Sequence, residues 1–471
     1  MLGVLSAALL IGCATKAPPS PEQIRQEAMK NIALPGSWKA GADAGPIADN
    51  WLAALGDPQL DALIAEALTN NPELRVTAVR VAQSAQYVEL AKAALRPSVS
   101  LLGTGGINMG GGDALQFISL GVSWEADLWG RMRYSRNAYQ ESYASAQADF
   151  EFGRQSLAAS VAKGWFSASE TWLQLQIAED MVKASQELLT LAEKRRQIGP
   201  GNEQDVAIAR ASLGTYQDTE KQVRLAHSQA LRAVELLVGR YPSAELAARH
   251  QLAKLAGQAP AGLPIEILER RPDMVAAERR VAAAFNRVGE AKAAQLPRFI
   301  LNANVAGVRS DILQLQEDFS NPTGGAGVRL NAPVYQGGAL TTQVTIRTLE
   351  QKEAVAEYAR MALRALGDVE NALAASQNLN ERETLLQRAV ADNENALALL
   401  RTSYRVGRSD LRAVQQQQLS VHVARLTLLR VQSEQLAQWA NLHLALGGSF
   451  QTASVNTPAV NTPVTNTNSK Q

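Results

Sequence analysis

The chain has 471 residues, and its 46 lysines and arginines balance 45 aspartates and glutamates, for a formal net charge of +1. Such a chain has no basic field to attract nucleic acid and no acidic field to concentrate cations, so we expect no nucleic-acid partner. Aromatic residues make up only 5% of the sequence, and the apolar content is mostly alanine and leucine, which is typical of long, closely packed helices.

The N-terminus carries a short apolar segment that leads into the only cysteine, Cys13. The run from Val4 to Ile11 is too short to span a bilayer as a helix, and a single thiol excludes an intrachain disulfide and a cysteine-cluster metal site. The segment Leu10-Ile11-Gly12-Cys13 resembles the lipobox of bacterial lipoproteins, in which the cysteine becomes the lipidated first residue. We therefore expect lipid on Cys13; the alternative is a buried cysteine in an N-terminal strand.

The sequence then repeats itself. Ala91–Pro97 matches Ala291–Pro297 at an offset of 200 residues, and Leu237-Val238-Gly239 matches Ala445-Leu446-Gly447 at an offset of 208. The two halves are therefore copies of one larger unit. Each copy opens with a predicted helix, from about Asp61 to Leu95 and from about Pro264 to Ala294.

Alternating segments follow each of these helices. Period-two alternation predicts four strands of about ten to twelve residues, long enough to cross a bilayer at a tilt. A solvent-facing sheet on a soluble core is the alternative. The clearest apolar positions are Ile118, Leu120, Val122, Trp124, Ala126 and Leu128, then Phe299, Leu301, Ala303 and Val305, then Ala326, Val328, Leu330, Ala332 and Val334.

A very long helix is predicted next in each copy, over residues 131–197 and 338–405. At 1.5 Å per residue each would reach roughly 100 Å. Each ends at a glycine-containing turn and returns as a helix about half as long, with Asn202 or Ser409 as the expected N-cap. Helices of this length need partners along their whole extent, which favours a coiled-coil barrel of neighbouring subunits.

The strand count predicts the oligomer. Unpaired backbone groups in lipid each cost several kcal/mol, so a membrane sheet must close, and four strands are too few. Two subunits would give eight strands and three would give twelve. An eight-stranded interior is largely filled by side chains, so a homotrimer is favoured for a conduit.

The order of elements carries a family resemblance. The segments concerned are Asp57-Pro58-Gln59-Leu60 to Asn71-Pro72, Asp127-Leu128-Trp129-Gly130-Arg131, Ala332-Pro333-Val334-Tyr335 to Gly338, and Tyr404-Arg405-Val406-Gly407. Together they resemble the TolC-type outer membrane factor family, in its OprM-like lipidated efflux branch. The resemblance implies an α+β membrane protein with a β-barrel joined to a long α-helical barrel.

That family implies a function and partners. The expected protein is a lipid-anchored homotrimeric duct in the cell outer membrane that extends into the periplasm and exports drugs or other small molecules. Its partners would be a periplasmic adaptor protein, an inner-membrane pump of the RND type and outer-membrane lipid. The outer-membrane duct of a type I protein secretion system is the alternative.

The repeat and the resemblance together divide the chain. The expected segments are a signal peptide (1–12), a lipidated N-terminal and equatorial segment (13–60), the first repeat (61–240), a linker or equatorial segment (241–263), the second repeat (264–448) and a disordered tail (449–471).

The candidate site is the periplasmic tip, where the long helices turn. Family members close this end with polar and charged side chains, so the resemblance implies a gate at Tyr404, Arg405, Arg408, Asp410 and Asp205. The alternative is that these residues only cap or end helices. Many relatives carry an acidic residue where this chain has Gln416, so cation binding at the tip should be weaker than in those relatives.

Enzymatic activity is not expected. The four histidines form no HxxxH or HExxH pair, and the sequence has neither a GxSxG elbow nor a GxxxxGK[ST] loop. We therefore expect no catalytic residue, metal or cofactor. A helical filament or adhesin would explain the long helices but not the alternating strands.

Overall fold

The computed structural model describes residues 15–41, 45, 47, 50–105, 116–199, 201–247, 251–255, 261–309 and 323–448. By contacts the chain forms two compact units. Unit 1 comprises Met1–Gly36, Pro72–Arg154 and Pro264–Gly367, and unit 2 comprises Ser37–Asn71, Gln155–Leu263 and Asp368–Gln471. Each unit therefore takes residues from both repeats.

The first helix of each repeat is broken at a proline. Helices α3 (Pro58–Asn70) and α4 (Pro72–Ala93) flank one break, and α7 (Ile267–Arg270) and α8 (Pro272–Ala293) flank the other. The predictions of a continuous helix over 61–95 and over 264–294 were wrong. A residue before proline is driven out of the helical region, and Asn71 and Arg271 accordingly have ψ of 123° and 126°.

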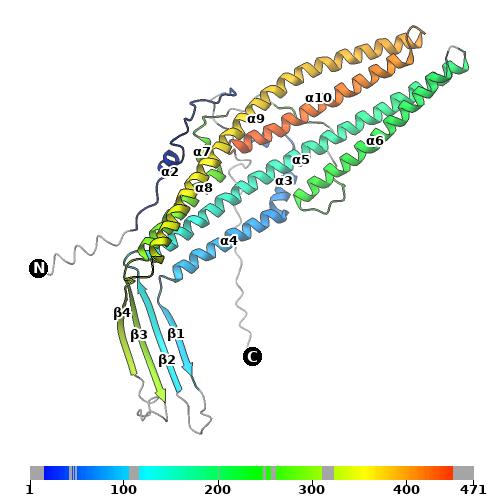
Figure 1. Cartoon of the computed structure of the whole chain (residues 1–471). Coiled ribbons are helices and arrows are strands. Elements are labelled where there is room, and N and C mark those ends of the chain that lie inside the picture. The colour runs from blue at the N-terminus through cyan, green and yellow to red at the C-terminus, as the bar shows by residue number, and fades with distance from the viewer. Residues whose placement is uncertain are drawn as a thin grey trace. The chain divides into compact units, whose positions relative to one another are not determined.

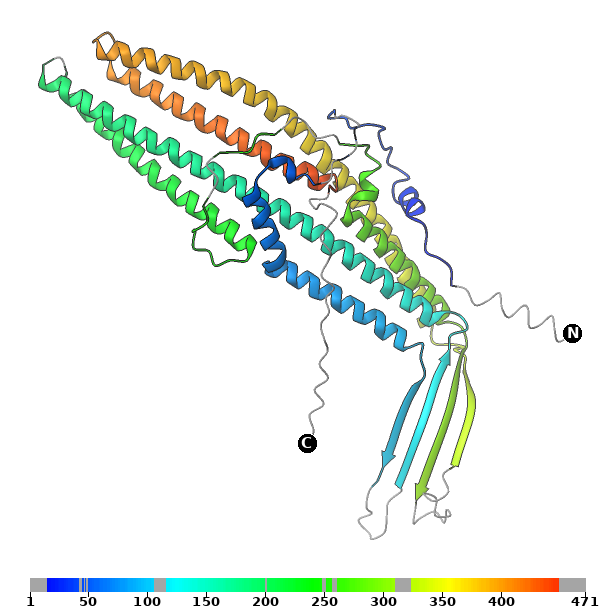
Figure 2. The same cartoon turned by 180° about the vertical axis from the view of Figure 1, so that it is seen from behind.

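The four predicted strands form one antiparallel sheet in unit 1 (Figures 1 and 2). The strands are β1 (Ser98–Thr104), β2 (Gln116–Ala126), β3 (Arg298–Arg309) and β4 (Thr323–Asn331), paired in the order β1-β2-β3-β4. Val122 lies opposite both Val99 and Ala303, and Leu301 lies opposite both Trp124 and Val328.

Directly opposed residues point to the same face of an antiparallel sheet. The register therefore collects one apolar face from all four strands: Val99 and Leu101; Ile118, Leu120, Val122, Trp124 and Ala126; Phe299, Leu301, Ala303 and Val305; Ala326, Val328 and Leu330. Hydroxyl, amide and charged side chains lie on the opposite face, among them Ser100, Ser119, Ser123, Asn302, Asn304 and Arg329.

Two predicted strand ends were wrong. β2 ends before Leu128, and β4 ends before Ala332 and Val334. Pro333 has no N–H to donate to a ladder, so the strand cannot continue through it. The loops between the paired strands, over 106–115 and 310–322, lie outside the described residues.

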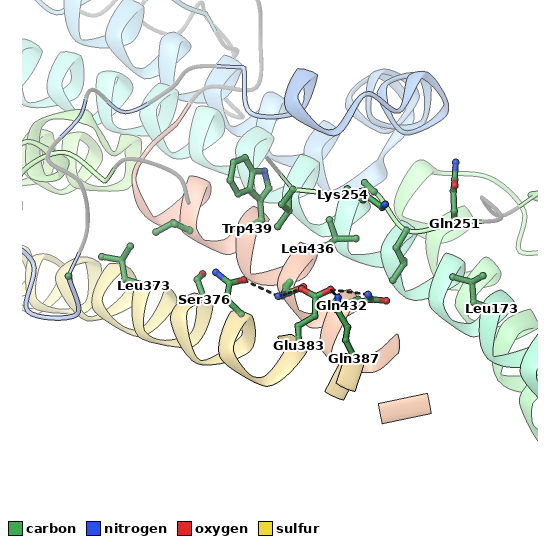
Figure 3. Close-up of a pocket in the computed structure, with 17 residues that line it drawn as sticks. Leu173, Gln251, Lys254, Leu373, Ser376, Glu383, Gln387, Gln432, Leu436 and Trp439 are labelled. Atoms are coloured by element: carbon green, nitrogen blue, oxygen red, sulfur yellow. Dashed lines mark hydrogen bonds between the residues drawn. The ribbon is translucent and has the colours of Figure 1, made fainter. Parts of the chain in front are cut away.

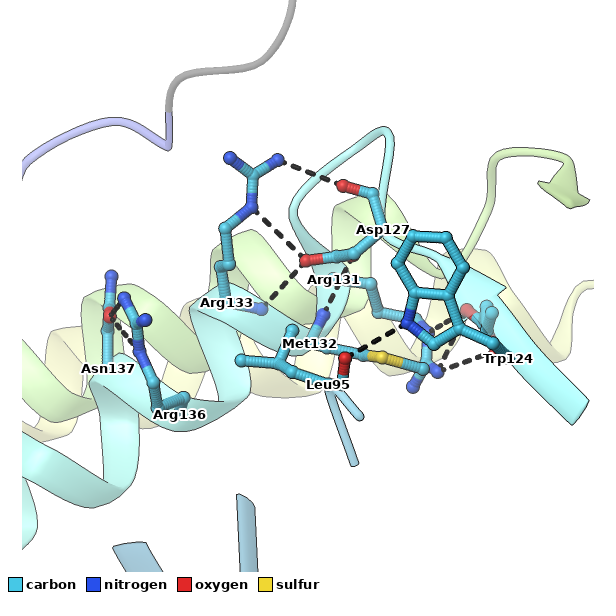
Figure 4. A network of polar contacts seen from close by, with 9 residues as sticks. Leu95, Trp124, Asp127, Arg131, Met132, Arg133, Arg136 and Asn137 are labelled. Carbon is cyan, nitrogen blue, oxygen red and sulfur yellow. Dashed lines mark hydrogen bonds and ion pairs between the residues drawn. The ribbon is translucent and has the colours of Figure 1, made fainter. Parts of the chain in front are cut away.

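A polar network joins β2 to the next helix, α5 (Arg131–Gln197), in unit 1 (Figure 4). The Asp127 carboxylate accepts hydrogen bonds from the backbone N–H groups of Met132 and Arg133, 3.1 and 3.0 Å away, and pairs with the Arg133 guanidinium at 3.2 Å. The Trp124 indole N–H donates to the Leu95 carbonyl oxygen at 3.0 Å. The Asp127 contacts fix the direction in which α5 leaves the sheet, because they satisfy orphan N–H groups of its first turn.

Both predicted long helices are confirmed. α5 and α9 (Ala339–Arg405) each have 67 residues, and they return as α6 (Glu203–Val238) and α10 (Leu411–Ala445). Gly199 and Gly407 have φ of 100° and 81°, a left-handed conformation that glycine adopts without steric cost. Among the described residues there are also α2 (Pro21–Ala28) and the short 3₁₀ helix η1 (Ala53–Leu55).

One of the two predicted helix caps is confirmed. The Asn202 side chain accepts the Asp205 N–H at 2.7 Å at the start of α6. The cap of α10 is not Ser409 but Asp410, whose carboxylate accepts the Ala413 N–H at 2.7 Å. Asp410 has extended backbone angles (φ −91°, ψ 165°), as an N-cap residue needs.

Unit 2 has a core in which α3 packs against α5 and α6. Trp165 and Leu60 are each 1% exposed, and Val234 is fully buried. The Asp57 carboxylate, also buried, accepts hydrogen bonds from the Trp165 indole at 2.9 Å and from the Leu60 N–H at the start of α3. A buried carboxylate is tolerated there because several donors satisfy it.

Unit 1 has its own helix contacts. Arg25 of α2 pairs with Glu269 of α7 at 2.7 Å, and Ile24 of α2 is buried. In α8, Gly289 lies so close to the Tyr134 ring of α5 that a Cβ placed on the glycine would meet ring atoms at 2.6 Å. A glycine is therefore required at this helix crossing by close approach rather than by backbone angle.

None of the helices that the structure describes is long and apolar enough to cross a membrane.

Candidate functional site

Figures 1 and 2 show the two helical hairpins α5–α6 and α9–α10 of unit 2. The helices on either side of the two turns contribute side chains to one apolar cluster. α5, α6, α9 and α10 all contribute, so the hairpin α5–α6 and the hairpin α9–α10 are held against each other near their turns. The buried members are Leu188, Leu189, Ala192, Val206, Ala209, Leu213, Tyr404, Leu411 and Val414.

Tyr404 belongs to this cluster and is only 2% exposed. The guanidinium carbon of Arg195, on α5, lies 4.5 Å from the centroid of the Tyr404 ring. An Arg195 N–H also donates a hydrogen bond to the backbone carbonyl oxygen of Tyr404. A cation over an aromatic face stabilises a contact by roughly 0.5–2 kcal/mol, more when desolvated, so this pair ties α5 to α9.

Asp205 is close enough to Tyr404 to act on it electrostatically. The pKa of Tyr404 is raised, first because burial disfavours the phenolate and then because of the Asp205 charge, while the Arg195 charge lowers it. The structure thus brings together two of the residues predicted from sequence. The tyrosine remains neutral at physiological pH.

The other three predicted tip residues are exposed. Arg405 and Arg408 have no ion-pair partner among the described residues, and Asp410 caps α10 through its side chain. The predicted tip residues therefore fall into two classes: Tyr404 makes a buried contact, whereas Arg405, Arg408 and Asp410 are exposed to solvent at the second turn.

Sequence reasoning missed Arg195. It stands in the run Lys194-Arg195-Arg196 at the C-terminal end of α5, where basic residues are common because they favour the negative end of the helix dipole. Its neighbour Arg196 does form an ordinary exposed ion pair, with Glu203. Nothing in the spacing distinguishes the arginine that reaches Tyr404.

Cys13 lies outside the described residues. The chain is described from Thr15, whose side chain lies 2.8 Å from the Cβ position of Gly130, at the start of α5. The next residue, Lys16, donates its backbone N–H to the Tyr134 hydroxyl at 2.8 Å. The segment after the cysteine is thus fixed beside the junction of sheet and helix in unit 1.

A second polar feature of unit 2 joins α9 to α10 beside a cavity of about 690 Å³ (Figure 3). The Glu383 carboxylate accepts amide hydrogen bonds from Gln387, Gln432 and Gln435, at 3.1, 2.9 and 3.0 Å. Because protein amides already occupy both carboxylate oxygens, Glu383 serves to hold the two helices together.

Comparison with known proteins agrees with this architecture. A family model described as outer membrane efflux protein matches residues 63–240 and 263–448. The pyoverdine export outer membrane protein OpmQ of Pseudomonas putida is 29% identical over 94% of this chain and 96% of its own length. The probable efflux pump outer membrane protein TtgC of the same species is 30% identical over 88% of each chain.

Solved structures match the fold as well. The outer-membrane channel OprN has a TM-score of 0.81 at 23% identity, with 93% of this chain and 99% of OprN covered. CusC has a TM-score of 0.80 at 25% identity over the same shares. The predicted resemblance and the predicted fold of helices and a four-stranded sheet in two repeats are confirmed. The chain belongs to the outer membrane efflux protein family and is an outer-membrane efflux channel.

Proposed function

We propose that three copies of this chain form a duct that is not an enzyme and that exports drugs or other small molecules, in contact with a periplasmic adaptor and an inner-membrane pump. The observation that carries this proposal is the sheet of unit 1. Its four strands present one apolar face and one mainly polar face, on which Leu102 and Ile300 stand among hydroxyl, amide and charged side chains. That division suits a wall with lipid on one side and water on the other.

The trimer follows from the edges of the same sheet. β1 and β4 each pair with one neighbour among the described strands. Exposed strand edges are not tolerated in lipid, so β1 of one copy would pair with β4 of the next until the sheet closes. Twelve strands leave space for a lumen, which eight do not.

Small organic molecules are the substrates that we propose. Relatives are named for pyoverdine export, for toluene efflux and for cation efflux. Of these, cations fit least, because Gln415 to Gln418 stand on α10 just after the second turn and Gln416 is exposed there without a charge. Export of polypeptides, as in type I secretion, is the second candidate function and would be seen as a secreted protein that is lost on deletion.

We place the gate and the adaptor contact at the turns. The Tyr404–Arg195 contact, with Asp205 beside it, would hold the two hairpins together and keep the tip narrow. The exposed Arg405 and Arg408, with Asp410 at the cap, would face the lumen or the adaptor. Burial supports this division of roles, since Tyr404 is the one predicted tip residue among the buried members of the cluster.

Crosslinking in the native cell tests this function directly. We expect the crosslinked protein to co-purify as a homotrimer with an adaptor and an inner-membrane pump, and a deletion strain to accumulate small antibiotics. A monomer or dimer by native mass spectrometry would contradict the trimer. Normal antibiotic accumulation with loss of a secreted polypeptide would favour the alternative.

We also propose that residues 1–12 are removed and that Cys13 carries lipid. The support is the placement of Thr15 and Lys16 beside Gly130 and Tyr134, where the sheet meets the helices. A lipid two residues earlier could then reach the membrane into which the sheet inserts. Mass spectrometry of the mature N-terminus is the test, and an unmodified thiol or retained Met1 would contradict the proposal.

The remaining segment boundaries are proposed on the same basis. They are the N-terminal and equatorial segment 13–60, the repeats 61–240 and 264–448, the linker 241–263 and the tail 449–471. Limited proteolysis of the assembled protein should cleave first within 449–471, if that segment is disordered.

A further inference from the structure

Unit 2 contains a second cavity, of about 380 Å³, between α5 on one side and α9 and α10 on the other. We refer to it as the α5/α10 cavity. Its volume falls in the range of small-molecule sites, roughly 300–1,000 Å³. Ile177 and Met181 of α5 and Leu397 of α9 provide apolar lining.

Two buried polar side chains line this cavity, and each has one nitrogen atom without a hydrogen-bond partner among the described residues. Gln418 is 2% exposed and His422 is 7% exposed, and the two lie one helical turn apart on α10. Within the part of the chain that the structure describes, Gln418 Nε2 and His422 Nδ1 have no hydrogen-bond partner. A buried polar group left unpaired costs about 1–3 kcal/mol, so two in one cavity require an explanation.

The neighbouring Gln417 shows that an unpaired amide nitrogen is not common to all of the glutamines at 415–418. Gln417 Nε2 donates to both the backbone oxygen and the side-chain oxygen of Asn393, at 3.0 and 2.9 Å. Gln417 therefore links α10 to α9 in the ordinary way. Gln418, one residue later, lines the α5/α10 cavity instead, and its Nε2 has no such partner among the described residues.

Both unpaired nitrogens can donate a hydrogen bond. Gln418 Nε2 is a donor, and a neutral histidine can carry its one proton on Nδ1. His422 is held neutral because burial, and then the nearby Arg425 charge, lower its pKa. Two residues that line the cavity thus each carry a buried, unpaired donor, which suits a ligand with acceptor oxygens.

The charges around the cavity are divided between its walls. The α5 wall carries Asp180, Lys183 and Glu187, a sum of −1. The wall formed by α9 and α10 carries Glu394, Arg401 and Arg425, a sum of +1, and Glu394 is already paired with Arg425. The surplus positive charge therefore lies on the wall that also holds the two donors.

We propose that the α5/α10 cavity binds a small carboxylate with an apolar body. One or both carboxylate oxygens would accept hydrogen bonds from Gln418 Nε2 and His422 Nδ1, with Arg401 favouring the negative charge. The apolar body would lie against Ile177, Met181 and Leu397. The proposal concerns a site in the wall of the chain itself and does not depend on what the channel exports.

Three probes of similar size test the chemistry: benzoate, benzamide and benzylammonium, titrated into the purified full chain in detergent by calorimetry and saturation-transfer NMR. We expect saturable binding of benzoate, binding of benzamide weaker by about tenfold or more, and no saturable binding of benzylammonium, because only the anion gains charge-assisted hydrogen bonds. Benzylammonium binding as tightly as benzoate, or no saturable binding of benzoate, would overturn the proposal.

Variants test the residues. Gln418→Met and His422→Phe keep the approximate size of each side chain but remove the donor, and each should weaken benzoate binding by about tenfold. Gln416→Met, an exposed position on the same helix, is the matched control and should leave it unchanged. Benzoate binding unaffected by both cavity variants would place it elsewhere and overturn the assignment.

The melting temperature separates a lost ligand contact from a lost fold. Without benzoate, Gln418→Met should not lower the melting temperature, because the amide nitrogen that it removes has no partner to lose. A marked fall would show that Gln418 is already satisfied within the protein, and the site would then be excluded.

Discussion

The guanidinium of Arg195 lies over the ring of Tyr404, 4.5 Å from its centroid, and donates a hydrogen bond to the backbone oxygen of the same residue. The two residues come from different hairpins, so one side chain ties α5 to α9 beside the turns. The Tyr404 hydroxyl, by contrast, is buried and has no hydrogen-bond partner among the described residues. The contact with Arg195 therefore runs through the ring and the backbone oxygen of Tyr404.

Removal of this contact should open the tip. We expect Arg195→Ala and Tyr404→Ala each to raise single-channel conductance in planar bilayers severalfold and to admit larger antibiotics into cells. Tyr404→Phe should leave conductance near that of the wild type, since it keeps the ring. Arg195→Ala breaks a contact worth roughly 0.5–2 kcal/mol, so that variant should still fold. Tyr404→Ala also removes a buried ring, at a cost of roughly 3–5 kcal/mol, so its folding is checked by circular dichroism before conductance is measured.

Arg405→Ala is the matched control for the gate, because Arg405 is adjacent but exposed. Because Arg405 lies outside the buried contact, Arg405→Ala should change the conductance much less than Arg195→Ala does. If Arg405→Ala opens the channel and Arg195→Ala does not, the gate lies in the solvated residues of the turn and not in the buried contact. Unchanged conductance in all variants would mean that these residues only end and cap their helices.

A charge on the apolar face of the sheet should block assembly. Val122 lies between Val99 and Ala303, and Val328 lies opposite Leu301. Arginine in place of either valine should destabilise the membrane-inserted barrel by about 2–4 kcal/mol if that face meets lipid near the midplane. The yield of assembled oligomer on a native gel should fall for both variants.

Ser119→Arg is the control for the sheet, because Ser119 lies on the opposite face, between Leu102 and Ala306. A water-filled lumen would tolerate that charge. Loss of assembly with Ser119→Arg, together with normal assembly of the two valine variants, would mean that the polar face is the one that meets lipid.

The crossing of α8 and α5 should not accept a methyl group. A Cβ at Gly289 would meet the Tyr134 ring at 2.6 Å, so Gly289→Ala should lower the free energy of unfolding by about 1–3 kcal/mol. Gly214→Ala is the opposite case. Gly214 lies within α6 with nothing within 4 Å of its Cβ position, and alanine there should be neutral or stabilising by up to about 1 kcal/mol.

Thermal unfolding followed by circular dichroism measures both glycine variants. Tyr134→Leu in the Gly289→Ala background should restore part of the loss, because a smaller side chain leaves room for the methyl group. A Gly289→Ala protein as stable as the wild type would show that the two helices can move apart at no cost.

His443 should make stability depend on pH. It is 1% exposed, stacks on Trp51 and lies edge-on to Trp439, and burial lowers its pKa from 6.5 to about 4. Its folded pKa is below its unfolded pKa, so its stability contribution is fully present above pH 6.5. The contribution is lost as pH falls toward and through 4, by roughly 3 kcal/mol in total.

The comparison for this prediction is His443→Phe, which keeps an aromatic ring between the two tryptophans. Between pH 7 and pH 4 the wild type should lose more stability than the variant, and the difference isolates the histidine from the carboxylates that titrate in the same range. Parallel pH profiles would show that His443 is not buried in the assembled protein.

Several features were readable from sequence because they depend on local spacing. A period of two in the apolar residues predicts which side chains share a face of a strand. The two 67-residue helices are predicted from stretches without proline that end at a glycine. The sheet register confirmed the predicted apolar face for Ile118 to Ala126 and for Ala326 to Leu330. The break before Pro72 and the end of β4 before Pro333 were also local signals, although the prediction extended the elements past them.

Other features were decided only by the tertiary structure. Arg195 and Tyr404 are 209 residues apart along the chain, so their contact is set by packing and not by spacing. The same holds for the contact of His443 with Trp51. Which of three adjacent basic residues reaches a ring depends on the rotation of two helices about their axes. That rotation is set by the apolar cluster of all four helices, and no single segment of sequence contains it.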